Sequence, residues 1–369
     1  MQFNDLGKQW ESIRETVIEK IDSLGYNGSY INGPAVSEFE SQFSSHYGTK
    51  YSIGVSNGTD GLKLALQVLD LSNEDLVIIP SNTFIADYLA VKHLPLVKPR
   101  VALIDHDENF TLDIKHLELF LKERRDDFNK VVVIPVHLYG HSCDMDVIVN
   151  LSKIYNFKII EDCSQSHETK YKGSYLGSYG EMAVYSLYPG KNLGACGDGG
   201  IITTNDKFLC ERLKSIRNYG SKVKYHYDEI GYNNRLDSIQ AIILSEKLKH
   251  LERWTEIKRQ IAQRYHAEIV NPKVTLPVIS EDCSVHSYHI FCLQVEDRKK
   301  FESHMNSAGI PTIIHYPIPI HQTSIFDTLD IVHSISRTDE TCEKIVSIPI
   351  HPFLTEGEVD LIISSVNSY

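Results

Sequence analysis

Lys191 stands in the stretch SLYPGKNLGACGDGG (residues 186–200), among five glycines. A phosphate-binding P-loop reads G-x-x-x-x-G-K-[ST], and Asn192 follows the lysine here, so the pattern disfavours a P-loop. A lysine directly after a buried strand can lose its charge through desolvation and act as a nucleophilic amine toward an aldehyde. The alternative is a surface lysine on a turn.

A second polar cluster lies in GVSNGTDGLKLAL (residues 54–66), where a predicted strand ends at Val55. Gly58 and Thr59 then lead into a predicted helix. The free N–H groups and the dipole of a helix N-terminus favour an anion such as phosphate. The alternative is an ordinary helix start capped by Asn57 or Thr59.

The stretch FKIIEDCSQSH (residues 157–167) places two carboxylates, Glu161 and Asp162, at the end of another predicted strand. A carboxylate there could pair with a cationic ring or a metal. A metal site needs further ligands at fixed spacing, and His167 completes no such signature, so we predict no metal. The alternative is a capping or surface acid.

Together these three clusters match the requirements of pyridoxal phosphate. The helix start would take the phosphate, Asp162 would pair with the pyridinium nitrogen, and Lys191 would hold the aldehyde.

The elements that must position these residues alternate along the chain. From residue 50 to about 205, short apolar runs alternate with segments whose apolar residues recur at spacing three and four. Strands that alternate with helices predict an α/β fold with a mostly parallel sheet covered on both faces. Ligands bind beyond the carboxyl ends of such strands, which is where the three clusters lie.

The pattern changes near residue 236, where helical periodicity continues for over thirty residues and predicts a kink or a domain connector. A smaller α+β domain is expected after it. We predict an N-terminal segment (1–30) that packs on the small domain, a large cofactor-binding domain (31–250) and a small C-terminal domain (251–369).

The composition limits the class of protein. The chain has 369 residues and a formal net charge of −12, which disfavours nucleic acid as a partner. Its polar start has no apolar signal core and its apolar runs are short, so no membrane association is expected. Seven cysteines without a C-x-x-C pair favour free thiols and a cytoplasmic location.

The quoted stretches, with SNTFIA, PVHLYGHSCDMD, RNYGSKVKY, GYNNRLDSIQAIIL and HYPIPIH, resemble the DegT/DnrJ/EryC/StrS family in order from about residue 30 to 355. That family consists of pyridoxal-phosphate sugar aminotransferases with the aspartate aminotransferase fold (fold type I). The resemblance implies a large domain with a mostly parallel sheet, a smaller C-terminal domain, and a homodimer whose subunits share two active sites.

The resemblance also assigns cofactor roles. Lys191 matches the Schiff-base lysine, Asp162 the acid at the ring nitrogen, and Gln165 the residue near the phenolic oxygen. The other matches are the phosphate-binding Gly58, Thr59 and Ser186, Phe84 against the ring, and Asn233, which contacts the phosphate from the neighbouring subunit.

The implied reaction is a transamination in two halves. L-Glutamate leaves its amino group on the cofactor, and the resulting pyridoxamine phosphate aminates the ketone of a nucleotide-linked sugar. A dehydratase branch of the family carries histidine in place of the lysine, so Lys191 favours transamination. A non-catalytic relative that only binds ligand is a further alternative, which the intact Lys191, Asp162 and Gln165 disfavour.

The stretch YPGKNLGACGDGG, with Tyr188, resembles family members that act at position 3 of a hexose. We therefore expect a TDP-linked 3-keto-6-deoxyhexose; a UDP-linked 3-keto uronic acid and a 4-keto sugar are the alternatives. The residues expected to bind the substrate are Tyr188, Lys224, Tyr225, Arg235, His315 and Tyr316. For His315 and Tyr316 the alternative is packing within the small domain.

Overall fold

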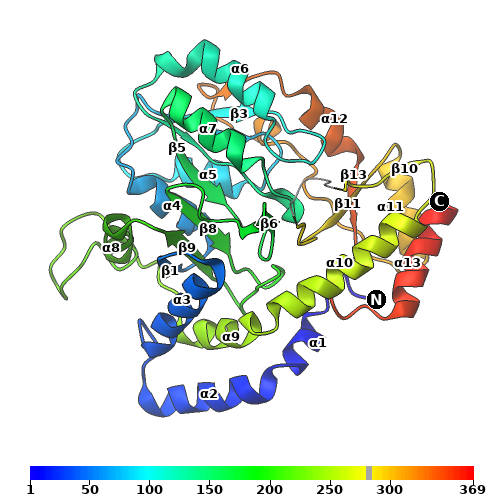
Figure 1. Ribbon diagram of the computed structural model, residues 1–369, viewed down its shortest axis with the longest axis horizontal. Coiled ribbons are helices and arrows are strands. Elements are labelled where there is room, and N and C mark those ends of the chain that lie inside the picture. The colour runs from blue at the N-terminus through cyan, green and yellow to red at the C-terminus, as the bar shows by residue number, and fades with distance from the viewer. Residues whose placement is uncertain (280–284) are drawn as a thin grey trace.

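The computed structural model describes residues 1–279 and 285–369 (Figure 1). Its centre is a large sheet in the order β1-β9-β8-β5-β4-β2-β3-β12. The strands in that order are β1 (Tyr51–Val55), β9 (Gly200–Thr204), β8 (Met182–Ser186), β5 (Lys158–Asp162), β4 (Val131–Val133), β2 (Leu76–Pro80), β3 (Arg100–Ile104) and β12 (Ile331–Val332).

The sheet is mostly parallel, which confirms the prediction, with one exception. From β8 to β12 all neighbouring strands are parallel, whereas β9 runs antiparallel to both β1 and β8. The segment that joins β8 to β9 contains Lys191 and no helix. Without a crossover helix, two adjacent strands pair antiparallel.

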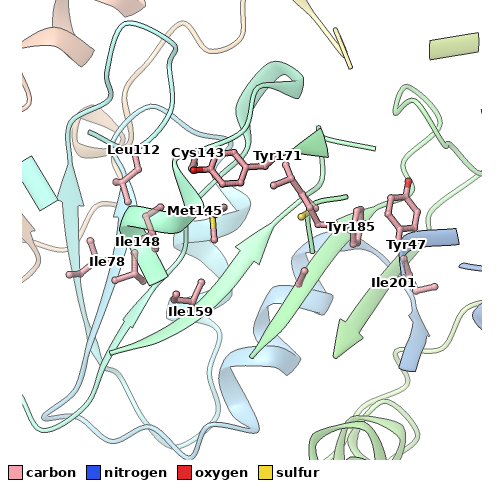
Figure 2. Packing of buried hydrophobic residues seen from close by; sticks show 14 of the residues in the cluster. Tyr47, Ile78, Leu112, Cys143, Met145, Ile148, Ile159, Tyr171, Tyr185 and Ile201 are labelled. Carbon is pink, nitrogen blue, oxygen red and sulfur yellow. Dashed lines mark hydrogen bonds between the residues drawn. The ribbon is translucent and has the colours of Figure 1, made fainter. Parts of the chain in front are cut away.

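Two apolar layers cover the sheet because successive side chains of a strand point to opposite faces. Leu76 and Ile78 of β2 belong to one buried cluster, and Val77 and Ile79 belong to the other. The first face is covered by α3 (Pro34–Tyr47), α6 (Ile114–Arg124), α7 (Met145–Tyr155) and α9 (Ser238–Leu248). The second is covered by α4 (Gly58–Gln67), α5 (Ala86–Lys92) and α8 (Lys207–Ile216). Figure 2 shows the first cluster, in which Met145 and Ile148 of α7 lie over the sheet beside Ile78 and Ile159.

A second, smaller sheet in the order β10-β11-β13 lies at the other end of the molecule (Figure 1). Its strands are antiparallel, and with its helices they enclose a separate buried cluster. These elements are β10 (Val274–Thr275), β11 (Phe291–Val295), β13 (Ile345–Ile348), α10 (Leu251–Glu268), α11 (Arg298–Ser307) and α13 (Glu356–Ser368).

The long helical stretch predicted from residue 236 is divided at Lys249 and His250 into α9 and α10. Helix α9 packs on α3 of the large sheet, and α10 extends to the small sheet (Figure 1). The predicted domain boundaries stay predictions, because C-terminal residues also join the large sheet. Strand β12, followed by α12 (Ser336–Lys344), pairs with β3 at its edge.

The N-terminal helices, α1 (Leu6–Glu11) and α2 (Arg14–Asn27), precede the large sheet. Ile13 and Val17 pack with Ile242 and Ile243 of α9 and with Trp254 of α10, so this segment contacts both parts of the chain. The remaining elements are the hairpin β6 (Lys170–Tyr171) and β7 (Ser174–Tyr175) and the 3-10 helices at Arg125–Asp127, Leu138–Gly140 and Ile320–Gln322. None of the helices in the described part of the chain combines the length and apolar character that a membrane crossing requires.

Candidate active site

A cavity of about 960 Å³ lies where the carboxyl ends of β1, β5 and β8 meet. The chain also lines it with the small-domain segment around residue 315 and with the first residues of the N-terminus. Most of the predicted site residues lie in its wall: Gly58, Thr59, Phe84, Asp162, Gln165, Ser186, Tyr188, Lys191, His315 and Tyr316.

Lys191 follows β8 on a turn in which its own N–H donates to the carbonyl of Tyr188 at 2.9 Å. Its side chain is half-buried in the cavity wall. Burial lowers the pKa of Lys191 to about 8, although the nearby carboxylates of Asp162 and Asp87 oppose this shift. About a tenth of the amine is therefore neutral and nucleophilic at pH 7.

Asp162 is the last residue of β5, and its buried carboxylate faces the cavity. Its Oδ1 accepts a hydrogen bond from the N–H of Ser164 at 2.9 Å, which orients the group. This arrangement places an acid, as predicted at this strand end, where it can contact a cationic ring atom.

The adjacent Glu161 points to the opposite face of the sheet and has a structural role. Its carboxylate accepts hydrogen bonds from the backbone N–H groups of Gly177, Tyr179 and Gly180. Ligand atoms of His137, Glu161 and Cys163 lie within 4.8 Å of one another, in a fully buried group. Because Glu161 already serves these three donors, we do not assign a metal to it.

The start of α4 forms a cradle for an anion. Asn57 caps the helix by accepting from the N–H of Asp60 at 2.8 Å, while the N–H groups of Gly58 and Thr59 donate to no acceptor in the described residues. The hydroxyl of Ser186 lies beside them, and a Cβ on Gly58 would stand 2.8 Å from the Ser186 Cβ. Free donors, the helix dipole and a close approach fit a phosphate group.

Gln165 and Tyr316 are tied together across the cavity. Gln165 Oε1 accepts from the N–H of Tyr139 at 2.8 Å, and its Nε2 donates to the Tyr316 hydroxyl at 3.0 Å. The Tyr316 ring lies 5.4 Å from the half-exposed Phe84 ring, centroid to centroid. These contacts join the small-domain segment that contains Tyr316 to the loop after β5, which contains Gln165, and to the loop after β2, which contains Phe84.

Several cavity residues were not predicted. Phe3 and Asn4 line it from the N-terminus, where Asn4 donates to the carbonyl of Gly190 at 3.4 Å and the Phe3 ring lies 6.1 Å from the His315 ring. Neither residue belongs to a periodic segment, so the sequence gives no signal for them. Asp87, which does not line the cavity but interacts with Asp162, was also not predicted, because a single acid in the apolar run FIADYLAV resembles a surface position of a helix.

Lys224, Tyr225, Asn233 and Arg235 lie outside this cavity. They belong to the segment between α8 and α9, part of which projects from the molecule in Figure 1, whereas the backbone of Arg235 pairs with Val55 at the end of β1. Arg235 donates to Asn218 Oδ1 at 3.0 Å and stacks on the Tyr219 ring, whereas Lys224, Tyr225 and Asn233 are exposed. Their roles stay predictions.

The sheet and the site together define a pyridoxal-phosphate-dependent transferase of fold type I. A half-buried lysine with a lowered pKa, a strand-end aspartate and an anion cradle line one cavity, and these are the groups that hold this cofactor.

Comparison with known proteins identifies the family. The chain belongs to the DegT/DnrJ/EryC1/StrS aminotransferase family, whose model matches residues 11–367. It is 42% identical over 367 residues to the dTDP-3-amino-3,6-dideoxy-alpha-D-galactopyranose transaminase of Aneurinibacillus thermoaerophilus, covering 100% of this chain and 99% of that protein. It is 35% identical to the dTDP-3-amino-3,4,6-trideoxy-alpha-D-glucose transaminase of Streptomyces venezuelae, covering 100% and 95%.

A solved structure agrees with this assignment. The crystal structure of S. venezuelae DesV in complex with a ketimine intermediate superposes with a TM-score of 0.92 at 34% identity, covering 100% of this chain and 97% of that one. Relatives at 33% and 30% identity are named for UDP-linked substrates.

Proposed function

We propose that this protein transfers the amino group of L-glutamate to the 3-keto group of a TDP-linked 6-deoxyhexose, giving a 3-amino-3,6-dideoxyhexose. The observation that carries the proposal is the meeting of Lys191, Asp162 and the start of α4 in one cavity. The position of amination and the nucleotide are supported by the 42% identical relative named for a dTDP-3-amino-3,6-dideoxy sugar.

The chain's own residues would hold the cofactor at three points. Lys191 would bind its aldehyde carbon, Asp162 would pair with its ring nitrogen, and the N–H groups of Gly58 and Thr59 would bind its phosphate. When bound, pyridoxal phosphate supplies an electron sink for the bond broken at the substrate carbon.

Lys191 would also move the proton. With a pKa of about 8, its amine is basic enough to take a proton from a substrate carbon and acidic enough to return it. Asp162 would serve a cationic ring as a carboxylate, and the hydrogen bond from the Ser164 N–H orients that carboxylate.

We infer a homodimer in which the loop after α8 completes the neighbour's site. Asn233 would contact the cofactor phosphate there, and Lys224, Tyr225 and Arg235 would bind the sugar nucleotide. These four residues do not line the cavity of their own chain, and Lys224, Tyr225 and Asn233 are exposed, which supports this inference. A cytoplasmic location is proposed on the scattered cysteines alone.

The test follows the cofactor absorbance in single half-reactions. The holoenzyme is converted to its amino form with L-glutamate, the glutamate is removed, and candidate sugars are added separately. We expect the aldehyde band to return with a TDP-linked 3-keto-6-deoxyhexose and not with the TDP-linked 4-keto sugar or the UDP-linked 3-keto uronic acid. Lys191→Ala is the matched control and should show no turnover.

Each of the other possible results would assign this protein a different substrate or a different activity. Return of the band with another keto sugar alone keeps the aminotransferase and corrects its substrate. Consumption of a sugar without an aminated product indicates a dehydratase. A protein that takes up no cofactor indicates a non-catalytic relative.

A further inference from the structure

A second carboxyl group, that of Asp87, is buried directly behind Asp162. It stands in the first turn of α5 and is wholly inaccessible to solvent. The hydroxyl of Thr83 donates to its Oδ2 at 2.7 Å. Its Oδ1 receives no hydrogen bond from any donor in residues 1–279 and 285–369. A buried, ionised carboxylate oxygen that accepts no hydrogen bond destabilises the folded protein. We therefore ask whether this oxygen carries a proton instead.

The groups that face Asp87 come from several elements. The Asp162 carboxyl of β5 is in hydrogen-bonding contact with it. The Lys191 amine, on the loop after β8, and the Tyr316 hydroxyl, from the small-domain segment, interact with both acids through their charges. Burial, followed by the negative charge of Asp162, raises the pKa of Asp87 well above its ordinary value. Two carboxyls in contact inside a protein do not both ionise, because like charges repel strongly there.

We propose that Asp87 is a positioning residue for Asp162: it keeps its proton and donates it from Oδ1 in a hydrogen bond to the Asp162 carboxylate. The two acids then present one negative charge to the cofactor ring. The buried Oδ1 thereby gains a partner as a donor instead of lacking one as an acceptor. This inference rests on the proposed role of Asp162 at the ring nitrogen.

The pair would set both the direction and the strength of the Asp162 charge. The Ser164 N–H holds Asp162 from one side, and Asp87 would hold it from the helix side. A hydrogen bond from a neutral acid draws charge away from Asp162, so the ring nitrogen would meet a weaker base than a lone carboxylate.

The first test measures the proton itself by infrared difference spectroscopy on the full chain stripped of cofactor. At pH 8 we expect the carbonyl band of a protonated carboxylic acid in the wild type and its loss in Asp87→Asn. Among the described acids, Asp107 also has a pKa raised by burial, to about 6, so it is ionised at pH 8. No band in the wild type, or a band that survives in Asp87→Asn, would overturn the proposal.

The second test measures the effect on the cofactor by the pH titration of the holoenzyme absorbance. Asp87→Asn keeps an N–H donor toward Asp162, so its titration midpoint should match the wild type. Asp87→Leu removes the donor while keeping the same branching of the side chain and leaves Asp162 with its full charge, so its midpoint should rise by about one pH unit. If Asn shifts the midpoint as far as Leu, Asp87 acts as a charge; if neither shifts it, Asp87 does not act on Asp162. Either result contradicts the proposal.

These outcomes separate this proposal from the proposed function. The infrared band is read without cofactor or sugar, so it stands whatever the substrate is. If the protein aminates the 3-keto sugar but shows no infrared band, the proposed function is supported and the proposed proton on Asp87 is contradicted.

Discussion

At the scale of single residues, burial sets the reactivity of Lys191. Desolvation lowers its pKa to about 8, and the two carboxyls beside it act in the opposite direction. Desolvation lowers the pKa of Lys191 by more than the two carboxylates raise it. Part of the amine is therefore neutral, and so nucleophilic, close to neutral pH.

The pH dependence of cofactor capture tests this value. Below pH 8 the neutral amine fraction, and with it the rate at which the stripped protein gains the cofactor band, should rise about tenfold per pH unit. Above pH 8 the rate should level off, whereas with a lysine of ordinary pKa the rate would continue to rise. Stopped-flow absorbance gives the rates, and Lys191→Arg is the control that should gain no band.

Asp87 makes the stability of the stripped protein depend on pH in a defined direction. Its pKa is raised in the folded chain, so the folded state keeps a proton that the unfolded chain releases above about pH 4. Stability is therefore lost as pH rises, by about 1.4 kcal/mol per pH unit, until the pH reaches the folded-state pKa. Asp87→Asn should lack this loss.

Urea unfolding of wild type and Asp87→Asn between pH 6 and 7.5 measures the difference. We expect the gap to widen in favour of the variant as pH rises. Asp107→Asn is the matched control, because its folded pKa of about 6 lies at the lower edge of that window, so its own contribution ends there while that of Asp87 continues. A gap that stays constant with pH would mean that Asp87 is ionised in the folded protein.

The residue pattern alone identified cavity residues near strand ends, the family resemblance added Phe84, Gln165, His315 and Tyr316, and other residues were missed. Lys191, Asp162 and Gly58 were found because a change from an apolar run to polar residues marks the end of a strand. Asp87 lies within a helical pattern, where a single acid reads as a surface position. Phe3 lies in no element, so its place beside His315 depends wholly on tertiary packing.

At the scale of elements, the anion cradle depends on how closely α4 approaches the sheet. A Cβ at Gly58 would stand 2.8 Å from the Ser186 Cβ, and one at Gly200 would stand 2.6 Å from the carbonyl carbon of Asn57. Both distances are shorter than a Cβ contact allows. Gly58 therefore allows the start of α4 to approach the end of β8, and Gly200 allows the start of β9 to approach the residue before α4.

Gly58→Ala should displace α4 and weaken the phosphate contact. We expect about 1–3 kcal/mol lower stability, from overpacking, and at least about tenfold weaker cofactor binding. Thermal unfolding and equilibrium dialysis measure the two effects. Gly357→Ala is the control, because a Cβ there meets no atom within 4 Å and the residue is helical. Wild-type cofactor affinity in Gly58→Ala would contradict the cradle.

The elements themselves were predicted unevenly. Strand β5 matches the apolar run that predicted a strand before Glu161 and Asp162. Strands β3 and β12 were not predicted. β12 has only two residues and pairs with a strand more than two hundred positions away, which no local pattern encodes. The antiparallel direction of β9 likewise depends on the loop that contains Lys191 and not on the strand's own residues.

At the scale of the whole molecule, the proposed homodimer makes a quantitative prediction. Lys191→Ala and Asn233→Ala remove groups that would come from different subunits of one site. In a heterodimer of the two variants, one site keeps both groups and the other loses both. An equal mixture of refolded variants should therefore regain about a quarter of wild-type turnover, since half of the dimers are mixed.

The controls are each variant refolded alone, and Asn233→Ala should also retain the cofactor less well than wild type. The double variant Lys191→Ala/Asn233→Ala mixed with Lys191→Ala should regain nothing. Failure of the mixture to gain activity while native mass spectrometry detects mixed dimers would place Asn233 outside the partner's site.

The short strand β12 also has a consequence for handling the protein. It covers the backbone edge of β3, and Asp330 secures it by accepting from the Tyr88 hydroxyl at 2.8 Å and from the Val101 N–H at 2.9 Å. An uncovered five-residue strand offers its hydrogen-bonding groups to other chains. Substitutions at Asp330 should therefore reduce the yield by aggregation during expression and storage, while the molecules that stay in solution remain active.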